Sequence, residues 1–218
     1  MKFYYKLFAI VFLFPLFSLA QSHYKPGYIV NLKGDTARGY IDYRGWDLNP
    51  DYIRFKPLTG NTVEKLSVND IDFFSIDKIT SYKRYEGFIS MDNTSEDRMI
   101  EFRDTSFKVA TVFLQVLQKG KNLSLYSYSD ALKSRYFIGE QPGFAPAELV
   151  YRLYYDMKIV TITHDGRTVN EDTYMKQLFT LAIKYDALSP WLQRALEEAG
   201  YREYNLVQVV KKINQAAK

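Results

Sequence analysis

Short apolar runs, many alternating with polar residues, recur between residues 27 and 164 and are separated by turn-forming residues. Alternation with a period of two places side chains on opposite faces of a strand, and Gly, Pro, Asn and Asp between runs favour turns. Regular short strands of this kind predict an antiparallel β-sandwich or a partly open barrel. The expected strands are 27–33, 36–43, 52–56, 62–66, 71–76, 85–91, 99–103, 111–118, 122–128, 135–138, 148–155 and 158–164.

The first two strands form the clearest local prediction. They flank Gly34-Asp35, and glycine in the first position is what a two-residue type II′ hairpin turn requires. Pairing the residues on either side of this turn places Val30 on an apolar face and Ile29 on the opposite face. A second hairpin is expected around Gly120.

After residue 166 the apolar period lengthens to that of a helix. A first helix is expected after Asn170, a suitable N-cap, and a second begins with Ser189-Pro190 and stops at Gly200. Asn205 is the expected cap of a third helix. The fold class is therefore mainly β with a C-terminal α segment of about three short helices.

The first twenty residues have the features of a secretory signal peptide. Lys2 and Lys6 precede an apolar run over residues 7–17, and small residues follow up to Ala20. Cleavage is expected between Ala20 and Gln21. The run is shorter than the roughly 20 apolar residues of a membrane-spanning helix.

These features predict three parts: a signal peptide (1–20), a β-rich domain (21–167), and a helical tail or small helical subdomain (168–218). After signal removal we expect no transmembrane segment, because every later apolar run is short or carries charges. The expected location is the periplasm or the cell surface.

Composition excludes several classes of function. The chain has no cysteine and two histidines, which rules out a disulfide framework, a thiolate metal site and a cysteine nucleophile. Loss of the signal peptide lowers the formal net charge from +4 to +2, too little for a nucleic-acid-binding surface. We expect no nucleic-acid partner and no cofactor.

No catalytic signature stands out, since the sequence has no phosphate-binding glycine loop, nucleophile elbow or paired-histidine motif. Asp70 and Asp72 share a strand face, and paired acids serve glycoside hydrolysis or calcium binding. A solvated strand face is the commoner role of such a pair. The polar loop 92–97 and His164 also favour surface turns. The prediction is a non-enzymatic protein, with a periplasmic hydrolase using carboxylates as the alternative.

Aromatic residues are the remaining candidates for recognition. Tyr126 and Tyr128 alternate on one strand face, and Trp46 lies in a loop. Such rings offer large rigid contact surfaces, although they also fill cores. These three residues are the candidate ligand contacts, and the expected partner is a glycan, a peptide or an envelope protein.

Three pieces of the chain resemble a family of uncharacterised exported proteins of Bacteroidetes: the opening 27–41, the middle 112–126, and a helical end carrying Tyr174, Leu178 and Leu206. The resemblance implies a cell-envelope setting and a shared architecture, and it implies no catalytic residues. In that setting Asp35-Thr36-Ala37 is similar to an acceptor sequence for protein O-glycosylation. Thr36 is therefore a candidate modification site.

Overall fold

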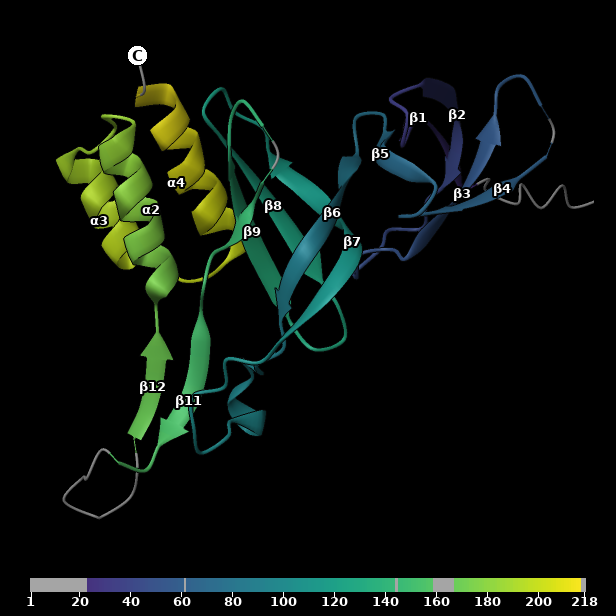
Figure 1. Cartoon of the computed structure of the whole chain (residues 1–218). Coiled ribbons are helices and arrows are strands. Elements are labelled where there is room, and N and C mark those ends of the chain that lie inside the picture. Colours follow the sequence, from purple (N-terminus) through teal and green to yellow (C-terminus); the bar gives the residue numbers. More distant parts are fainter. Residues whose placement is uncertain (1–22, 61, 144, 159–166, 217–218) are drawn as a thin grey trace, which may run out of the picture.

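The structure is a computed structural model that describes residues 23–60, 62–143, 145–158 and 167–216. Within these residues ten strands form one antiparallel sheet, two more form a separate hairpin, and three α-helices follow at the C-terminal end (Figure 1). This confirms the predicted fold class. The ten-stranded sheet is open, with order β10-β9-β8-β7-β6-β5-β1-β2-β3-β4.

The strands and helices largely follow the alternating and helical runs of the sequence. They are β1 (Tyr24–Asn31), β2 (Thr36–Asp42), β3 (Tyr52–Pro57), β4 (Glu64–Ser67), β5 (Ile71–Ile76), β6 (Thr80–Ser90), η1 (Glu96–Arg98), β7 (Phe107–Gln118), β8 (Leu123–Ser129), β9 (Ser134–Glu140), β10 (Ala147–Glu148), β11 (Arg152–Asp156), β12 (Arg167–Glu171), α2 (Thr173–Lys184), α3 (Pro190–Glu198) and α4 (Glu203–Ala216).

The first hairpin forms, but its predicted register was wrong. Val30 pairs with Thr36, which shifts every later pair along the two strands. As a result Ile29 lies on the buried face with Ile41, whereas Val30 is only half-buried. Leu32, expected on the apolar face, is exposed in the turn.

The turn itself explains the shift. The Gly34 N–H donates to the Asn31 carbonyl at 3.0 Å, and Gly34 has a φ of 91°. The Asn31 side chain accepts hydrogen bonds from the backbone N–H groups of Lys33 and Asp35, each at 2.9 Å. The loop is thus a three-residue connection whose last residue, Gly34, is in the left-handed conformation. A two-residue type II′ turn would instead have this glycine as its first residue.

Other predicted elements differ mainly at their ends. The run 148–155 divides into β10 and β11, and residues 99–103 form no strand. Asn170, expected to cap a helix, lies in β12 and pairs with Leu153 of β11, so α2 begins only after Asp172. The strand predicted over 158–164 falls largely outside the described residues.

The three helices pack against one face of β8 and β9. Leu123 and Leu125 of β8 share a buried cluster with Leu206 and Val210 of α4. We call this cluster the helix core. Ser189 caps α3 as predicted, since its Oγ accepts a hydrogen bond from the Leu192 N–H at 3.2 Å. The C-terminal helices are therefore docked on the sheet. No helix in the described parts of the chain is long and apolar enough to cross a membrane.

A second cluster, the N-terminal core, is formed mainly by β1–β5, at the end of the sheet far from the helices, and includes Tyr82 of β6 and Phe113 of β7 (Figure 1). Asn49, in the loop after β2, connects this part to the middle of the sheet. Its Nδ2 donates to the carbonyls of Phe113 (2.7 Å) and Ser127 (3.1 Å), and its Oδ1 accepts from the Ser129 N–H at 2.9 Å. These bonds hold the middle of β7 against the end of β8, just beyond the last β7–β8 pair, Gln115 with Ser127.

A third cluster, the middle core, lies on the face of β8 and β9 opposite the helices. Its buried members are Ile89, Leu114, Tyr126, Tyr128 and Phe137. Both faces of β8 are therefore covered. The far end of β6 closes over this cluster and forms one wall of the candidate site.

Candidate functional site

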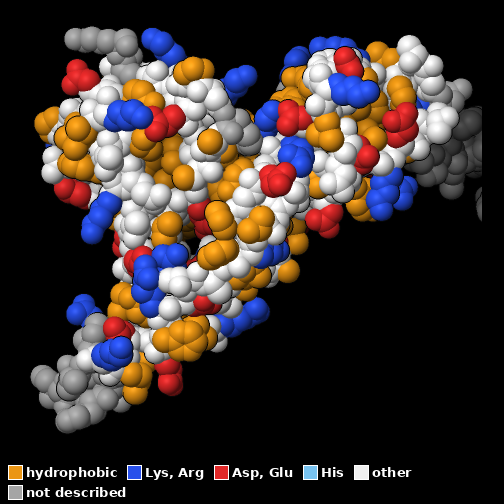
Figure 2. Space-filling view, viewed as in Figure 1, with side chains coloured by type: hydrophobic (Ala, Val, Ile, Leu, Met, Phe, Trp, Pro, Cys, Tyr) orange, Lys and Arg blue, Asp and Glu red, His pale blue; other side chains and the backbone are white. Residues whose placement is uncertain are grey.

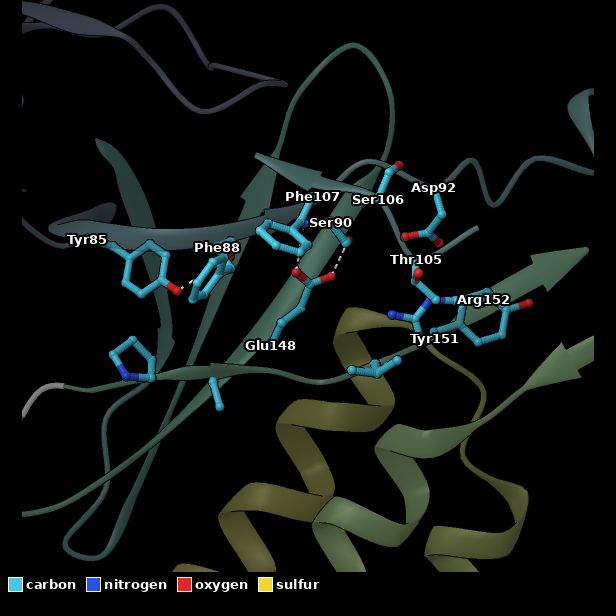
Figure 3. Close-up of a pocket in the computed structure, with 13 residues that line it drawn as sticks. Tyr85, Phe88, Ser90, Asp92, Thr105, Ser106, Phe107, Glu148, Tyr151 and Arg152 are labelled. Carbon is cyan, nitrogen blue, oxygen red and sulfur yellow. Dashed lines mark hydrogen bonds between the residues drawn. The ribbon is translucent and has the colours of Figure 1, made fainter. Parts of the chain in front are cut away.

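A pocket of about 490 Å³ opens beside the end of β6 and the start of β7 (Figure 3). Ser90 pairs with Phe107 across these strands, and the Met91 N–H donates to the Ser106 carbonyl at 2.9 Å. This pairing brings the loops that follow β6 and precede β7 together. The segment from Pro146 to Arg152 supplies the opposite wall.

Phe88 and Phe107 form the outer edge of the pocket, which we call the aromatic rim. The two rings meet edge to face with centroids 4.8 Å apart, yet the residues are 61% and 60% exposed. Figure 2 shows hydrophobic side chains gathered over the middle of the molecule, where β6 and β7 run. Exposed aromatic pairs beside a pocket mark contact surfaces more often than scattered apolar residues do.

Tyr85 and Tyr151 complete the aromatic lining behind the rim. The Tyr85 hydroxyl donates to the Phe88 carbonyl at 3.4 Å. Burial raises the pKa of Tyr85, and the neighbouring Glu148 carboxylate raises it further. Burial likewise raises the pKa of Tyr151. Both phenols are therefore neutral hydrogen-bonding groups at neutral pH.

Glu148 of β10 crosses the pocket to the end of β6. Its two carboxylate oxygens accept from the Ser90 N–H, at 3.1 Å, and from the Ser90 hydroxyl (Figure 3). The Arg135 guanidinium reaches the same residue from β9, with Nε donating to the Ser90 carbonyl at 2.7 Å. Side chains, rather than strand pairing, thus fix the last residue of β6 against β9 and β10.

Buried charges support the inner end of the pocket. Asp92 is 3% exposed, and the Lys133 ammonium lies 2.9 Å from its Oδ2. Burial lowers the pKa of Lys133, and the Asp92 carboxylate opposes that shift. Arg135 is fully buried and donates from Nη1 to Asp130, at 3.0 Å, and to the Lys133 carbonyl. The inner wall is therefore a compact set of paired charges.

Three residues of the inner wall keep unused hydrogen-bonding capacity. Within the described residues, both carboxylate oxygens of Asp92, the Nη2 of Arg135 and the Nε of Arg152 are buried without a hydrogen-bond partner. The Lys133 ammonium forms a buried ion pair with Asp92, 2.9 Å from its Oδ2. Figure 3 shows the Asp92 carboxylate and the Arg152 guanidinium pointing toward the same space, with Thr105 between them.

Arg152 is held from its other side. Its Nη1 donates to Glu171 at 3.0 Å, and Glu171 also accepts two hydrogen bonds from Arg103, at 2.6 and 2.8 Å. These bonds, the Arg103 hydrogen bond foremost, hold the pKa of the Glu171 carboxyl below its usual value. Glu171 thus fixes the guanidinium through Nη1 and leaves Nε without a partner among the described residues.

The three aromatic residues predicted as ligand contacts are not brought together. Trp46 packs edge to face on Phe74 and Tyr82 in the N-terminal core. Tyr126 and Tyr128 are buried in the middle core, and Arg135 lies over the Tyr128 ring at 5.6 Å. None of the three lines the pocket described above. As ligand contacts they remain predictions.

The predicted acidic pair does not converge either. Asp70 accepts hydrogen bonds from the backbone and side chain of Ser67, which lower its pKa. Asp72 forms an ion pair with Lys83 on the neighbouring strand. Among the described residues no group of three or more metal-ligating side chains occurs.

The remaining predicted residues lie on the surface or outside the described parts. Thr36 is exposed at the start of β2, directly after the turn, and its modification stays a prediction. Ala20, Gln21 and His164 fall outside the described residues.

Sequence reasoning missed most of the pocket. The sequence predicted Glu148 and Arg152 to lie in one long strand. It gave no indication that the chain leaves the sheet between them, so that they belong to β10 and β11. Phe88 lies inside the run 85–91 and Phe107 directly follows a polar stretch, so neither stood out in the sequence as part of a site. Asp92 was recognised only as part of a polar turn.

Comparisons of the chain with protein-family models, with curated proteins and with solved structures give no match. The chemistry of the pocket itself is therefore the basis for inferring a function.

Proposed function

We propose that this chain is an exported, non-enzymatic binding module of the cell envelope, with its ligand site in the pocket beside β6, β7 and β10. The observation that carries the proposal is the aromatic rim next to buried polar atoms of Asp92 and Arg152 that make no hydrogen bond within the described part of the chain. Ligand sites combine apolar walls with a few placed polar groups in this way. A volume of about 490 Å³ lies within the usual range for small-ligand sites.

The state of the pocket carboxylates supports binding over hydrolysis. Both oxygens of Glu148 already accept hydrogen bonds from Ser90, and Asp92 is paired with Lys133. A general acid must carry a transferable proton, and a general base must present a free lone pair to the reacting group. Asp70 and Asp72, the acids of the hydrolase alternative, have separate partners away from the pocket.

Export rests on the predicted signal peptide. Sequencing the N-terminus of the protein recovered outside the cytoplasm tests it, with Gln21 expected as the first residue. A recovered chain that still begins at Met1 would contradict this part of the proposal.

Binding is tested with ligand-observed NMR on the mature chain and a defined panel of neutral disaccharides, dipeptides and peptidoglycan fragments. At least one compound should bind, and Phe107→Ala should weaken its binding at least about tenfold. Phe102→Ala is the matched control, because Phe102 is 65% exposed and does not line the pocket. Absence of binding across the panel, or equal effects of the two variants, would contradict the proposal.

A further inference from the structure

The geometry points to a neutral saccharide as the ligand, with adjacent hydroxyls facing Asp92 and Arg152 and a C–H face of the sugar ring against the aromatic rim. This inference rests on the proposed binding function and names the chemical class that the same pocket takes.

The first step is the unused hydrogen-bonding capacity of the inner wall. In the described structure Asp92 has two buried carboxylate oxygens that accept no hydrogen bond, although its Oδ2 faces the Lys133 ammonium, and Arg152 has one buried donor, Nε, without an acceptor. A ligand that satisfies all three must offer at least two donors and one acceptor within a short span. Adjacent hydroxyls meet this need, because each hydroxyl both donates and accepts.

The second step is charge. Asp92 is already paired with Lys133, and Arg152 is paired with Glu171. Glu148 and Arg135 also have their own partners around Ser90. A charged ligand would bring a further charge into a wall where Asp92, Arg135 and Arg152 already have charged counterparts, at a desolvation cost that a neutral ligand avoids.

The third step is the shape of the rim. The Phe88 and Phe107 rings stand at 88° to each other, so one ring face and one ring edge line the entrance. A pyranose ring has flat faces rich in C–H groups, which pack on an aromatic face, while its hydroxyls project from the ring edge. A sugar therefore matches the apolar outer part and the polar inner part of the pocket together.

A peptide fits less well. A backbone amide offers one donor, which leaves one oxygen of Asp92 unsatisfied, and a free terminus adds a charge. Thr105 and Ser106 add hydroxyls beside the same space, which suits a ligand with several hydroxyl groups. The pocket volume of about 490 Å³ accommodates one or two sugar rings.

Isothermal titration calorimetry of the mature chain tests the inference. The probes are N,N′-diacetylchitobiose and cellobiose as neutral sugars, glucuronic acid as a charged sugar, and glycyl-phenylalanine as a peptide. At least one neutral disaccharide should bind, at least about tenfold more tightly than glucuronic acid or the dipeptide.

Two variants locate the binding. Phe107→Ala and Arg152→Met should each weaken disaccharide binding at least about tenfold, and Phe102→Ala should leave it unchanged. Arg152→Met is preferred to a substitution at Asp92, because Lys133 would then lose its buried partner, whereas Glu171 keeps both bonds from Arg103. A thermal melt confirms that each variant is folded.

The outcomes separate this inference from the proposed function. Rim-dependent binding of the dipeptide or the charged sugar, without binding of neutral sugars, overturns the saccharide and leaves the binding module standing. If Arg152→Met leaves disaccharide binding unchanged, the sugar hydroxyls do not bind at Arg152. If no probe binds and the NMR panel is also negative, both proposals fail.

Discussion

Arg135 is a large side chain that is fully buried, and it connects β9 to the wall of the pocket. Its guanidinium donates to the Ser90 carbonyl, to Asp130 and to the Lys133 carbonyl at 2.7 to 3.0 Å. A buried cation with several partners is difficult to replace, because its loss leaves those partners unsatisfied.

We expect Arg135→Met to lower the free energy of unfolding by about 3 kcal/mol, since the apolar side chain leaves the Ser90 carbonyl without its side-chain donor and removes the buried counter-charge of Asp130. Urea denaturation measures the loss. Arg98→Met, at an exposed position, is the control and should change stability by less than about 0.5 kcal/mol. Equal stability of the two variants would contradict the buried role of Arg135.

At Gly27, in contrast to Arg135, the structure has no room for any side chain. A Cβ on Gly27 would lie 2.2 Å from the Ser75 carbonyl oxygen, a backbone atom of the paired strand β5. The two strands can accommodate it only by moving apart.

Gly27→Ala should therefore destabilise the protein by about 2–3 kcal/mol, the range expected for overpacking. Gly60→Ala is the matched control, because a Cβ there meets no atom within 4 Å. Chemical denaturation of both variants checks the difference, and a stable Gly27→Ala protein would show that β1 and β5 are not this close.

At the scale of elements, Asn214 attaches α4 to the sheet. Its Oδ1 accepts from the backbone N–H groups of Asn122 and Leu123 at 3.1 and 2.9 Å, and its Nδ2 donates to the Leu123 and Val210 carbonyls at 3.0 Å. One side chain thus ties the last helix to the start of β8.

Asn214→Ala removes these bonds and leaves backbone groups of β8 without partners, which we expect to cost about 2 kcal/mol. Amide hydrogen exchange at Asn122 and Leu123 should become faster, while Gln215→Ala, an exposed neighbour, should leave it unchanged. Unaltered exchange in Asn214→Ala would mean that α4 is held by the helix core alone.

Elements with local signals were predictable from the sequence. The strand 71–76 has the predicted bounds, and Ser189-Pro190 begins α3, because strand alternation and helix capping depend on neighbouring residues. Asn170 failed as a cap because long-range pairing with Leu153 draws it into a strand. Gly34 marked a turn correctly, but two turn types use glycine there, and they differ in register.

The candidate site was less predictable for a physical reason. Phe107 begins β7, whereas Glu148 and Arg152 come from the segment 146–152, and the two segments meet only in the folded chain. The unsatisfied atoms of Asp92 become visible only when burial and hydrogen bonding are known. Conversely, Tyr126 and Tyr128 alternate as a binding face would, but the bend of β6 over β8 and β9 buries them.

At the scale of the whole molecule, tyrosines that are buried or half-buried in different parts of the fold make stability depend on alkaline pH. The pKa values of Tyr82, Tyr174 and Tyr185 are raised to about 12 from an ordinary value of 10, with burial as the main cause. The folded protein therefore keeps protons that the unfolded chain releases between pH 10 and 12.

Stability should thus be independent of these groups below pH 10 and should fall as the pH rises from 10 toward 12. Urea midpoints measured across this interval check the trend. Tyr174→Phe should make the decline shallower, because one titrating group is removed. A midpoint that stays constant or rises above pH 10 would contradict the burial of these phenols.

The central claim is that the pocket beside β6, β7 and β10 is the ligand site. An amide NMR titration of the mature chain with each compound of the panel and with N,N′-diacetylchitobiose tests it most directly. We expect concentration-dependent shifts at Asp92, Ser106, Phe107 and Arg152 with at least one compound, and binding at least about tenfold weaker in Phe107→Ala. Shifts confined to another region, such as the surroundings of Trp46, or no shifts with any compound, would contradict it.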